Sequence, residues 1–237
     1  MRPARFRKEA PVRTTSFRLT TLAAIVAGAW LLLAPAAPSA LGPERVVAVA
    51  DVHGALDEFV AILRETGLVD DRRAWSGGTA TFVQTGDVVD RGARTRECLD
   101  LVISLQRQAS IAGGRVVPLI GNHEVMNVIG DLRYVTPAIF RSFASRDAEK
   151  RRDAARKEYL AFLKAHAGHG HAAAPPADEA GRKAWDAEHP DGFFEHRDAF
   201  GPDGMYGRWI RANRAIAQIG DGVFVHGGIN PALEFAT

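Results

Sequence analysis

Four short polar segments contain side chains of the kind that bind divalent metals, and each follows an apolar run. They are residues 51–54 (Asp-Val-His-Gly), 86–92 (Gly-Asp-Val-Val-Asp-Arg-Gly), 121–124 (Gly-Asn-His-Glu) and 226–228 (His-Gly-Gly). Carboxylate and amide oxygens and imidazole nitrogens are ligands for such metals, and an arginine and a spare histidine accompany them. The combination indicates metal-assisted hydrolysis of a phosphate ester.

Five of these side chains are candidate metal ligands. Asp51 and His53 lie two residues apart in a segment that we expect to be extended, so both face the same side. Asp87 is the natural bridging ligand, because a carboxylate can give one oxygen to each of two cations about 3.5–4 Å apart. Asn122 offers an amide oxygen and His226 an imidazole to the second cation. Taken alone, polar turns would explain the two aspartates, and a structural role would explain His226.

Three further side chains are candidates for acting on the substrate. His123 cannot easily point the same way as its neighbour in an extended segment, so we assign it to proton transfer. Asp90 would hold its other ring nitrogen and raise its basicity. Arg91 has a planar fork that matches two phosphate oxygens, and a solvated charge beside Asp90 is the alternative.

The segments that must position these side chains alternate between strands and helices. Strands are predicted at residues 45–50, 79–85 and 115–120, and helices at residues 55–65 and 94–109. This is the βαβ rhythm of an α/β protein, in which ligands gather at the carboxyl ends of the strands. Pro118 is unfavourable in a central strand.

Residues 136–204 break this rhythm with densely charged sequence of mixed sign. We interpret them as a helical insertion whose tip is too poor in large apolar side chains to fold alone. After it, residues 207–211 predict a helix, and residues 215–219 and 223–226 predict two strands. Residues 41–237 are therefore expected to form one domain.

The first forty residues have the pattern of an export signal. Basic residues precede an apolar run at residues 19–34, which small residues follow. The run is about 16 residues long, short of the roughly 20 that a bilayer span needs, so a cleaved signal is favoured over an uncleaved signal anchor. We expect a periplasmic protein, or one anchored in the membrane and facing outside.

The leader also accounts for the basic pI of about 8.9. The whole chain carries +2, and the six basic residues and one acidic residue of the leader contribute +5, which leaves −3 for the rest. Without a basic patch interleaved with aromatics, no nucleic-acid partner is expected. Cys98 is the only cysteine, so no intramolecular disulfide can form, and its helical context favours a buried thiol over a nucleophile.

With these segments the chain resembles the calcineurin-like metallophosphoesterases of the phosphoprotein-phosphatase type, and more narrowly the Shewanella-like phosphatases. The narrower resemblance rests on residues 121–135 (Gly-Asn-His-Glu-Val-Met-Asn-Val-Ile-Gly-Asp-Leu-Arg-Tyr-Val) and 207–211 (Gly-Arg-Trp-Ile-Arg). The family implies an α/β fold, an αββα sandwich of two mixed sheets. It also implies two divalent metal ions, with manganese or iron/zinc pairs usual.

The resemblance distributes the ligands between the two metals. One metal would take Asp51, His53 and Asp87. The other would take Asp87, Asn122 and His226. The family has one more histidine ligand well after the His-Gly-Gly segment, whereas this sequence ends at residue 237. We therefore expect a C-terminally incomplete domain from a truncated sequence. If the sequence is the whole protein, we expect weak binding of the second metal and low activity.

The resemblance also implies a reaction. A metal-bridging hydroxide would attack phosphorus in line, Arg91 would steady the phosphate, and His123, oriented by Asp90, would protonate the leaving oxygen. The expected substrate is a phosphate monoester, either a phosphorylated protein (some relatives prefer phosphotyrosine) or a small ester. The alternatives are a nucleotide or dinucleoside polyphosphate hydrolase, and a truncated, non-catalytic remnant that binds without turnover.

Overall fold

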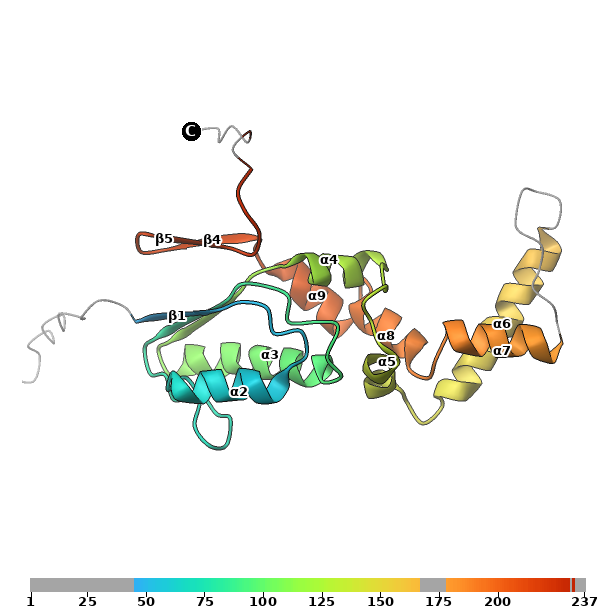
Figure 1. Ribbon diagram of the computed structural model, residues 1–237, viewed down its shortest axis with the longest axis horizontal. Helices are drawn as coiled ribbons and strands as arrows, with labels where there is room; N and C mark the ends of the chain where they lie inside the picture. Colours follow the sequence, from blue (N-terminus) through green and yellow to red (C-terminus); the bar gives the residue numbers. More distant parts are fainter. Residues whose placement is uncertain (1–44, 167–177, 231, 233–237) are drawn as a thin grey trace, which may run out of the picture. The chain divides into compact units, whose positions relative to one another are not determined.

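The computed structural model describes residues 45–166, 178–230 and 232, and residues Glu44–Thr237 form one unit. A three-stranded parallel sheet lies at its centre. The sheet is made of β1 (Val46–Val49), β2 (Thr81–Gln84) and β3 (Arg115–Pro118), in the order β1-β2-β3. Helices α2 (Leu56–Glu65) and α3 (Thr95–Ile111) connect these strands and cover one face of the sheet (Figure 1).

The two faces of the sheet follow from the alternation of side chains along each strand. Phe82 and Val116 point into the larger apolar core, which α2 and α3 complete. Their neighbours Val83 and Val117 point the other way, into a smaller core with Ala217. All four residues of β2 are buried, including the polar Gln84, whose side chain hydrogen-bonds the backbone of Gly86.

Helix α2 shows why the connecting segments are helical. Its buried side chains recur at intervals of three and four residues, which places them on one face, and they are Leu56, Phe59, Val60 and Leu63. Acidic residues in its first turn and Arg64 in its last turn complement the helix dipole. The apolar face packs against the sheet and so fixes the loop that precedes the helix.

The second sheet is an antiparallel hairpin of β4 (Ile216–Ile219) and β5 (Gly222–Val225). Its inner side chains pack on the face of the parallel sheet opposite to α2 and α3. The expected α/β fold with parallel and antiparallel pairing is thus confirmed. In the described part of the chain, however, each sheet has a single kind of pairing and neither is mixed. Strand β3 is an edge strand among these residues, which accommodates Pro118.

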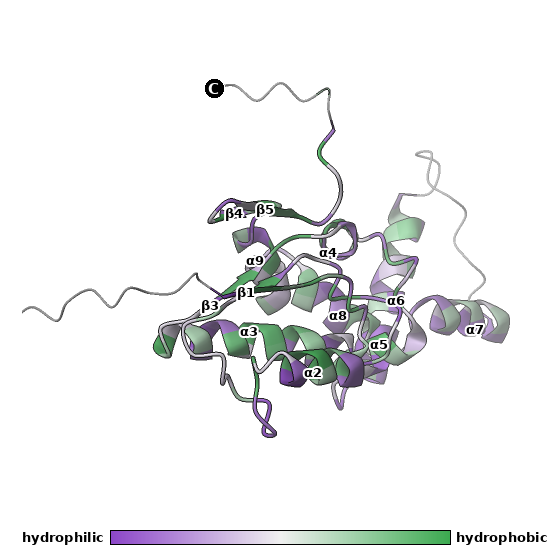
Figure 2. Cartoon of the chain, turned by 60° about the vertical axis from the view of Figure 1, so that its left-hand side comes forward, coloured by the Kyte–Doolittle hydropathy of each residue, from purple (hydrophilic) through white to green (hydrophobic). Residues whose placement is uncertain are grey.

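The described residues of 136–204 form four helices, and they are α5 (Pro137–Phe143), α6 (Ala148–Ala165), α7 (Glu179–Glu188) and α8 (Phe193–Phe200). Helices α6 and α7 carry many hydrophilic residues (Figure 2) and bury few side chains. Ion pairs join this region, with Arg152 and Arg182 each 2.8 Å from a carboxylate, those of Asp191 and Asp153 respectively. The helical character agrees with the sequence, and the status of the region as an insertion stays a prediction.

Helix α9 (Met205–Ala212) follows and leads into β4. The predicted leader at residues 1–40 lies outside the described residues. Within the described residues, no helix has both the length and the apolar character needed to cross a bilayer.

Helix α4 (Asn122–Ile129) corrects the prediction of an extended segment at residues 121–124. The chain turns into a helix directly after Gly121, so Asn122 and His123 are the first two helical residues. In a helix, consecutive side chains point about 100° apart. Asn122 and His123 therefore point in different directions as expected, but because the backbone is helical and not because it is extended.

Candidate metal centre

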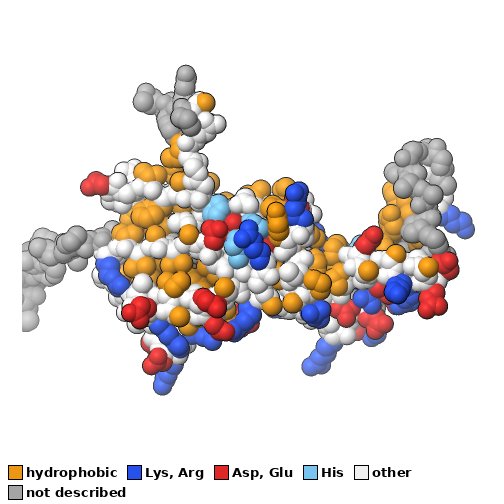
Figure 3. Space-filling view, in the orientation of Figure 1, with side chains coloured by type: hydrophobic (Ala, Val, Ile, Leu, Met, Phe, Trp, Pro, Cys, Tyr) orange, Lys and Arg blue, Asp and Glu red, His pale blue; other side chains and the backbone are white. Residues whose placement is uncertain are grey.

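The polar segments that the sequence singled out meet at one place. The loops after β1, β2 and β3 leave the carboxyl ends of parallel strands at the same edge of the sheet, and the segment after β5 reaches the same point. Figure 3 shows histidine, aspartate and arginine side chains gathered on this face near the start of α4. The convergence on which the sequence interpretation depends is therefore present.

The Asp87 carboxylate lies at the middle of the cluster and is buried, with 3 % of the residue exposed. Its Oδ2 atom is 3.6 Å from His53 Nε2 and 3.3 Å from His226 Nε2. Asp51 completes the first predicted set, with Oδ2 also 3.6 Å from His53 Nε2. Asn122 completes the second, with Oδ1 3.0 Å from His226 Nε2. The structure thus brings together all five candidate ligands.

The distances between these ligand atoms fit a shared cation better than they fit direct hydrogen bonds. The separations of 3.3 to 3.8 Å among the aspartate and histidine atoms are long for hydrogen bonds, and they fit two ligands that share an ion at about 2.0–2.2 Å from each. His53 Nδ1 donates a hydrogen bond to the Val89 carbonyl at 2.8 Å, which leaves Nε2 with a free lone pair. Among the described residues, that buried Nε2 atom has no hydrogen-bond partner.

His123 is held differently, by a carboxylate on one ring nitrogen. Its Nδ1 atom lies 2.7 Å from Asp90 Oδ2, and both side chains are almost fully buried. Asn127 Nδ2 donates a hydrogen bond of 2.9 Å to the other Asp90 oxygen, so the carboxylate cannot rotate away. His123 Nε2 therefore faces the centre, 3.9 Å from Asp87 Oδ2 and 3.5 Å from Arg91 Nη2.

Arg91 itself is exposed, and its guanidinium stands at the rim of the cluster. Its Nη2 atom lies 3.5 Å from the ring atom His123 Nε2, and its exposure makes the positive charge accessible to an anion that enters from solvent. The arrangement places a cationic fork and an oriented imidazole on the same side of Asp87.

Sequence reasoning missed Glu124 and Asn127. The buried Glu124 carboxylate accepts hydrogen bonds of 2.8 Å from the backbone N–H groups of Asp87, Val88 and Gly121. It thereby ties the second loop to the start of α4. Burial raises the pKa of Glu124, and those three backbone hydrogen bonds oppose the rise. A glutamate in the third position of a helix is a known capping signal that the sequence contained.

The backbone at the centre departs from the extended geometry expected for Asp51 and His53. His53 has a φ of 46°, and Asp87, Asp90 and Arg91 have φ values between 56° and 70°. Such left-handed conformations are uncommon for residues other than glycine, and they collect at functional sites where surrounding contacts impose them. Here the Asp87 carbonyl accepts the N–H of His53 at 2.9 Å, so the two loops hold each other.

Cys98 lies apart from this centre, fully buried in α3. Burial raises the pKa of its thiol to about 12, which keeps it protonated. The prediction of a buried thiol is confirmed.

Residues 44–234 match the family model of the calcineurin-like phosphoesterases. Because this match spans most of the sequence, the chain belongs to that family of hydrolases. The family expected from the motifs is confirmed.

Among individual proteins, the chain is similar to Shewanella-like protein phosphatase 2 of Arabidopsis thaliana, with 32% identity over 79% of this chain and 47% of that protein. It is also 34% identical to Shewanella-like protein phosphatase 1 of Plasmodium berghei, over 45% of this chain and 30% of that one. Among solved structures, the cold-active protein-tyrosine phosphatase of a psychrophilic Shewanella species matches with a TM-score of 0.53 and 30% identity, over 80% of this chain and 43% of that chain. The chain spans at most about half the length of the curated relatives that it matches.

Proposed function

We propose that this chain is the metal-binding part of a phosphatase that hydrolyses phosphate monoesters with two divalent metal ions. The observation that supports this most strongly is the position of Asp87, buried between two imidazoles that belong to different loops. A buried carboxylate beside the His53 Nε2 atom, which has no hydrogen-bond partner among the described residues, is costly unless a cation joins them.

The ligand sets that we propose are those that the family resemblance implies. Asp51 and His53 would hold one ion with Asp87, and Asn122 and His226 would hold the other. Bound there, divalent cations would polarise the phosphate ester and make water a better nucleophile at neutral pH. Manganese is the proposed metal, with an iron/zinc pair as the second choice.

Three side chains of the chain would act on the substrate. Arg91 would hold two phosphate oxygens with its exposed guanidinium. His123 would deliver a proton from Nε2 to the leaving oxygen, because Asp90 occupies the opposite ring nitrogen and fixes the direction of the ring. Asn127 would keep Asp90 in that position through its 2.9 Å hydrogen bond.

The substrate that we propose is a phosphotyrosyl protein, with small phosphate esters as accessible substitutes. The similarity to a protein-tyrosine phosphatase of Shewanella supports this choice. For location we propose export, on the pattern of residues 1–40. N-terminal sequencing of the protein recovered from the periplasm tests that proposal, and an intact leader on protein recovered from the cytoplasm contradicts it.

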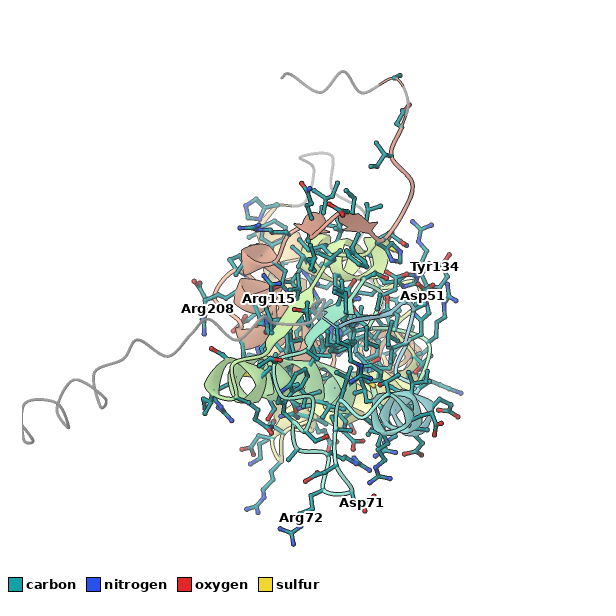
Figure 4. All side chains as sticks on the ribbon, turned by 90° about the vertical axis from the view of Figure 1, so that its left-hand side faces the viewer. Asp51, Asp71, Arg72, Arg115, Tyr134 and Arg208 are labelled. Carbon is teal, nitrogen blue, oxygen red and sulfur yellow. The ribbon has the colours of Figure 1, made fainter. Side chains whose placement is uncertain are left out.

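The test of the function is hydrolysis of an aryl phosphate by the purified protein with added manganese. We expect turnover that a chelator abolishes and that Asp87→Asn reduces by at least about a hundredfold, because the bridging carboxylate is lost. Asp71→Asn is the matched control, since Asp71 lies on an exposed loop at a distance from Asp51 (Figure 4).

Three results would contradict the proposal. Turnover that persists in chelator would remove the metal from the reaction. Turnover of diadenosine polyphosphate without turnover of the aryl ester would favour a nucleotide hydrolase. Metal binding without any turnover would indicate a non-catalytic binding protein, and His123→Ala would then leave the behaviour of the protein unchanged.

A further inference from the structure

The side chain of Tyr134 stands beside the proposed acid and the proposed phosphate-binding arginine, and the function described above gives it no part. Its ring centroid is 4.9 Å from that of His123. The Arg91 guanidinium carbon lies over the ring, 5.9 Å from the centroid. The residue is 43% exposed, so much of the ring remains open to solvent. Figure 4 shows Tyr134 on the same edge of the domain as Asp51.

The backbone around Tyr134 is fixed on both sides. Its carbonyl accepts the N–H of Arg91 at 3.2 Å, which ties it to the loop after β2. The next residue, Val135, is buried and donates its N–H to the Leu132 carbonyl at 3.0 Å. Before it, Arg133 and Asp131 form a two-point pair with distances of 2.9 and 2.7 Å. An exposed aromatic ring on an anchored backbone is preorganised for contact with a ligand.

The place of the ring decides which part of a substrate it would meet. If Arg91 holds the phosphate and His123 protonates the leaving oxygen, the group attached to that oxygen must pass next to His123. Two described rings border His123, that of His53 at 4.7 Å and that of Tyr134 at 4.9 Å. Of these, the Tyr134 ring is the one that is open to solvent, since the residue is 43% exposed and the His53 side chain 12%. Aromatic rings gain most from a partner ring at centroid distances of 4.5–7 Å, in offset or edge-to-face geometry.

We propose that Tyr134 is a specificity-determining residue that contacts an aromatic leaving group and so favours aryl phosphates over alkyl phosphates. This inference rests on the proposed phosphatase function and adds to it the residue that selects the substrate. In a purely structural role, Tyr134 would only support His123. Replacing it would then lower the hydrolysis of all phosphate esters equally.

The test compares kcat/KM for phenyl phosphate and cyclohexyl phosphate in the manganese-loaded protein. The two esters have leaving groups of similar size, and the intrinsic difference in their reactivity cancels when the variants are compared with the parent. We expect Tyr134→Ala to lower the ratio of phenyl to cyclohexyl turnover by roughly two- to tenfold. We expect Tyr134→Phe to keep it, since the ring remains. Ile129→Ala is the control, because Ile129 is an exposed apolar residue of α4 outside the centre.

A binding measurement separates this inference from the function on which it rests. Phenylphosphonate should bind the manganese-loaded parent more tightly than methylphosphonate, and Tyr134→Ala should remove most of that difference. Equal losses for both esters or both phosphonates would overturn the inference and leave the phosphatase function standing. If the parent hydrolyses neither ester, the proposed function fails, and the phosphonate comparison still decides whether Tyr134 contacts an aromatic group. If neither phosphonate binds, both proposals are wrong.

Discussion

A histidine buried away from the metal centre makes the stability of this protein depend on pH. His196 in α8 is fully buried, and aromatic rings surround it at centroid distances of 5.2 Å (Phe140), 4.9 Å (Phe143) and 4.5 Å (Phe200). Neither of its ring nitrogens has a hydrogen-bond partner among the described residues. Burial lowers the pKa of His196 from 6.5 to about 3, and the charge of Arg197 adds to the effect.

The direction of the pH effect follows from which state binds the proton. Between the folded pKa of about 3 and the unfolded pKa of 6.5, the unfolded chain carries a proton on His196 and the folded chain does not. The free energy of unfolding therefore rises with pH in this window, and the contribution of His196 is fully present above it. From about pH 8 down to about pH 5, the loss amounts to about 2 kcal/mol. That value depends little on the exact folded pKa, as long as it lies well below 5.

The perturbation that isolates this effect is His196→Leu, which keeps an apolar side chain of similar size and removes the titration. Urea unfolding of parent and variant in chelator, so that metal release does not contribute, gives the difference in unfolding free energy at each pH. We expect this difference to shift by about 2 kcal/mol in favour of the variant between about pH 8 and about pH 5. Ile129→Ala, at an exposed residue that does not titrate, is the control and should show no such shift. Parallel curves for parent and His196→Leu would refute the reasoning.

Three more outcomes follow from the centre and its surroundings. Glu124→Gln should destabilise the protein by about 2 kcal/mol or more in urea unfolding and should weaken manganese binding by titration calorimetry, because an amide can accept only part of the three backbone hydrogen bonds. Unchanged stability would contradict this. Asp90→Asn should lower kcat by about a hundredfold or more with the metal content unchanged, since Asp90 contacts His123 and no proposed ligand. Loss of metal from this variant would instead show that Asp90 shapes the metal site. Cys98 should be inert to a thiol reagent at about pH 8 in the folded protein and reactive in urea, and rapid labelling of the folded state would disprove its burial.

Much of the fold was readable from the sequence because it follows local rules. The residues Thr-Phe-Val at 81–83 of β2 are β-branched or aromatic, which favours a strand, and α2 has apolar residues at helical spacing. The convergence of the three loops also follows from a general rule, since consecutive parallel strands end at one edge of their sheet. Residue types at those ends then indicated a metal site.

Other features were out of reach because distant contacts impose them. The helical start at Asn122 depends on Glu124, whose carboxylate receives N–H groups from a loop more than thirty residues away as well as from Gly121. The left-handed backbone of His53 and Asp87 runs against the preference of those residues and is held by bonds between the two loops. Local propensity contains the capping signal of Glu124, but no information about the contacts between the separate loops.

The central claim is that Asp87 joins two metal ions, and the most direct measurement of it is the manganese bound per chain at equilibrium. The account predicts that the parent binds the metal and that Asp87→Asn loses affinity for both ions together, because both ions would share the same carboxylate. Asp71→Asn should bind as the parent does. Manganese binding by Asp87→Asn that equals that of the parent would contradict the account.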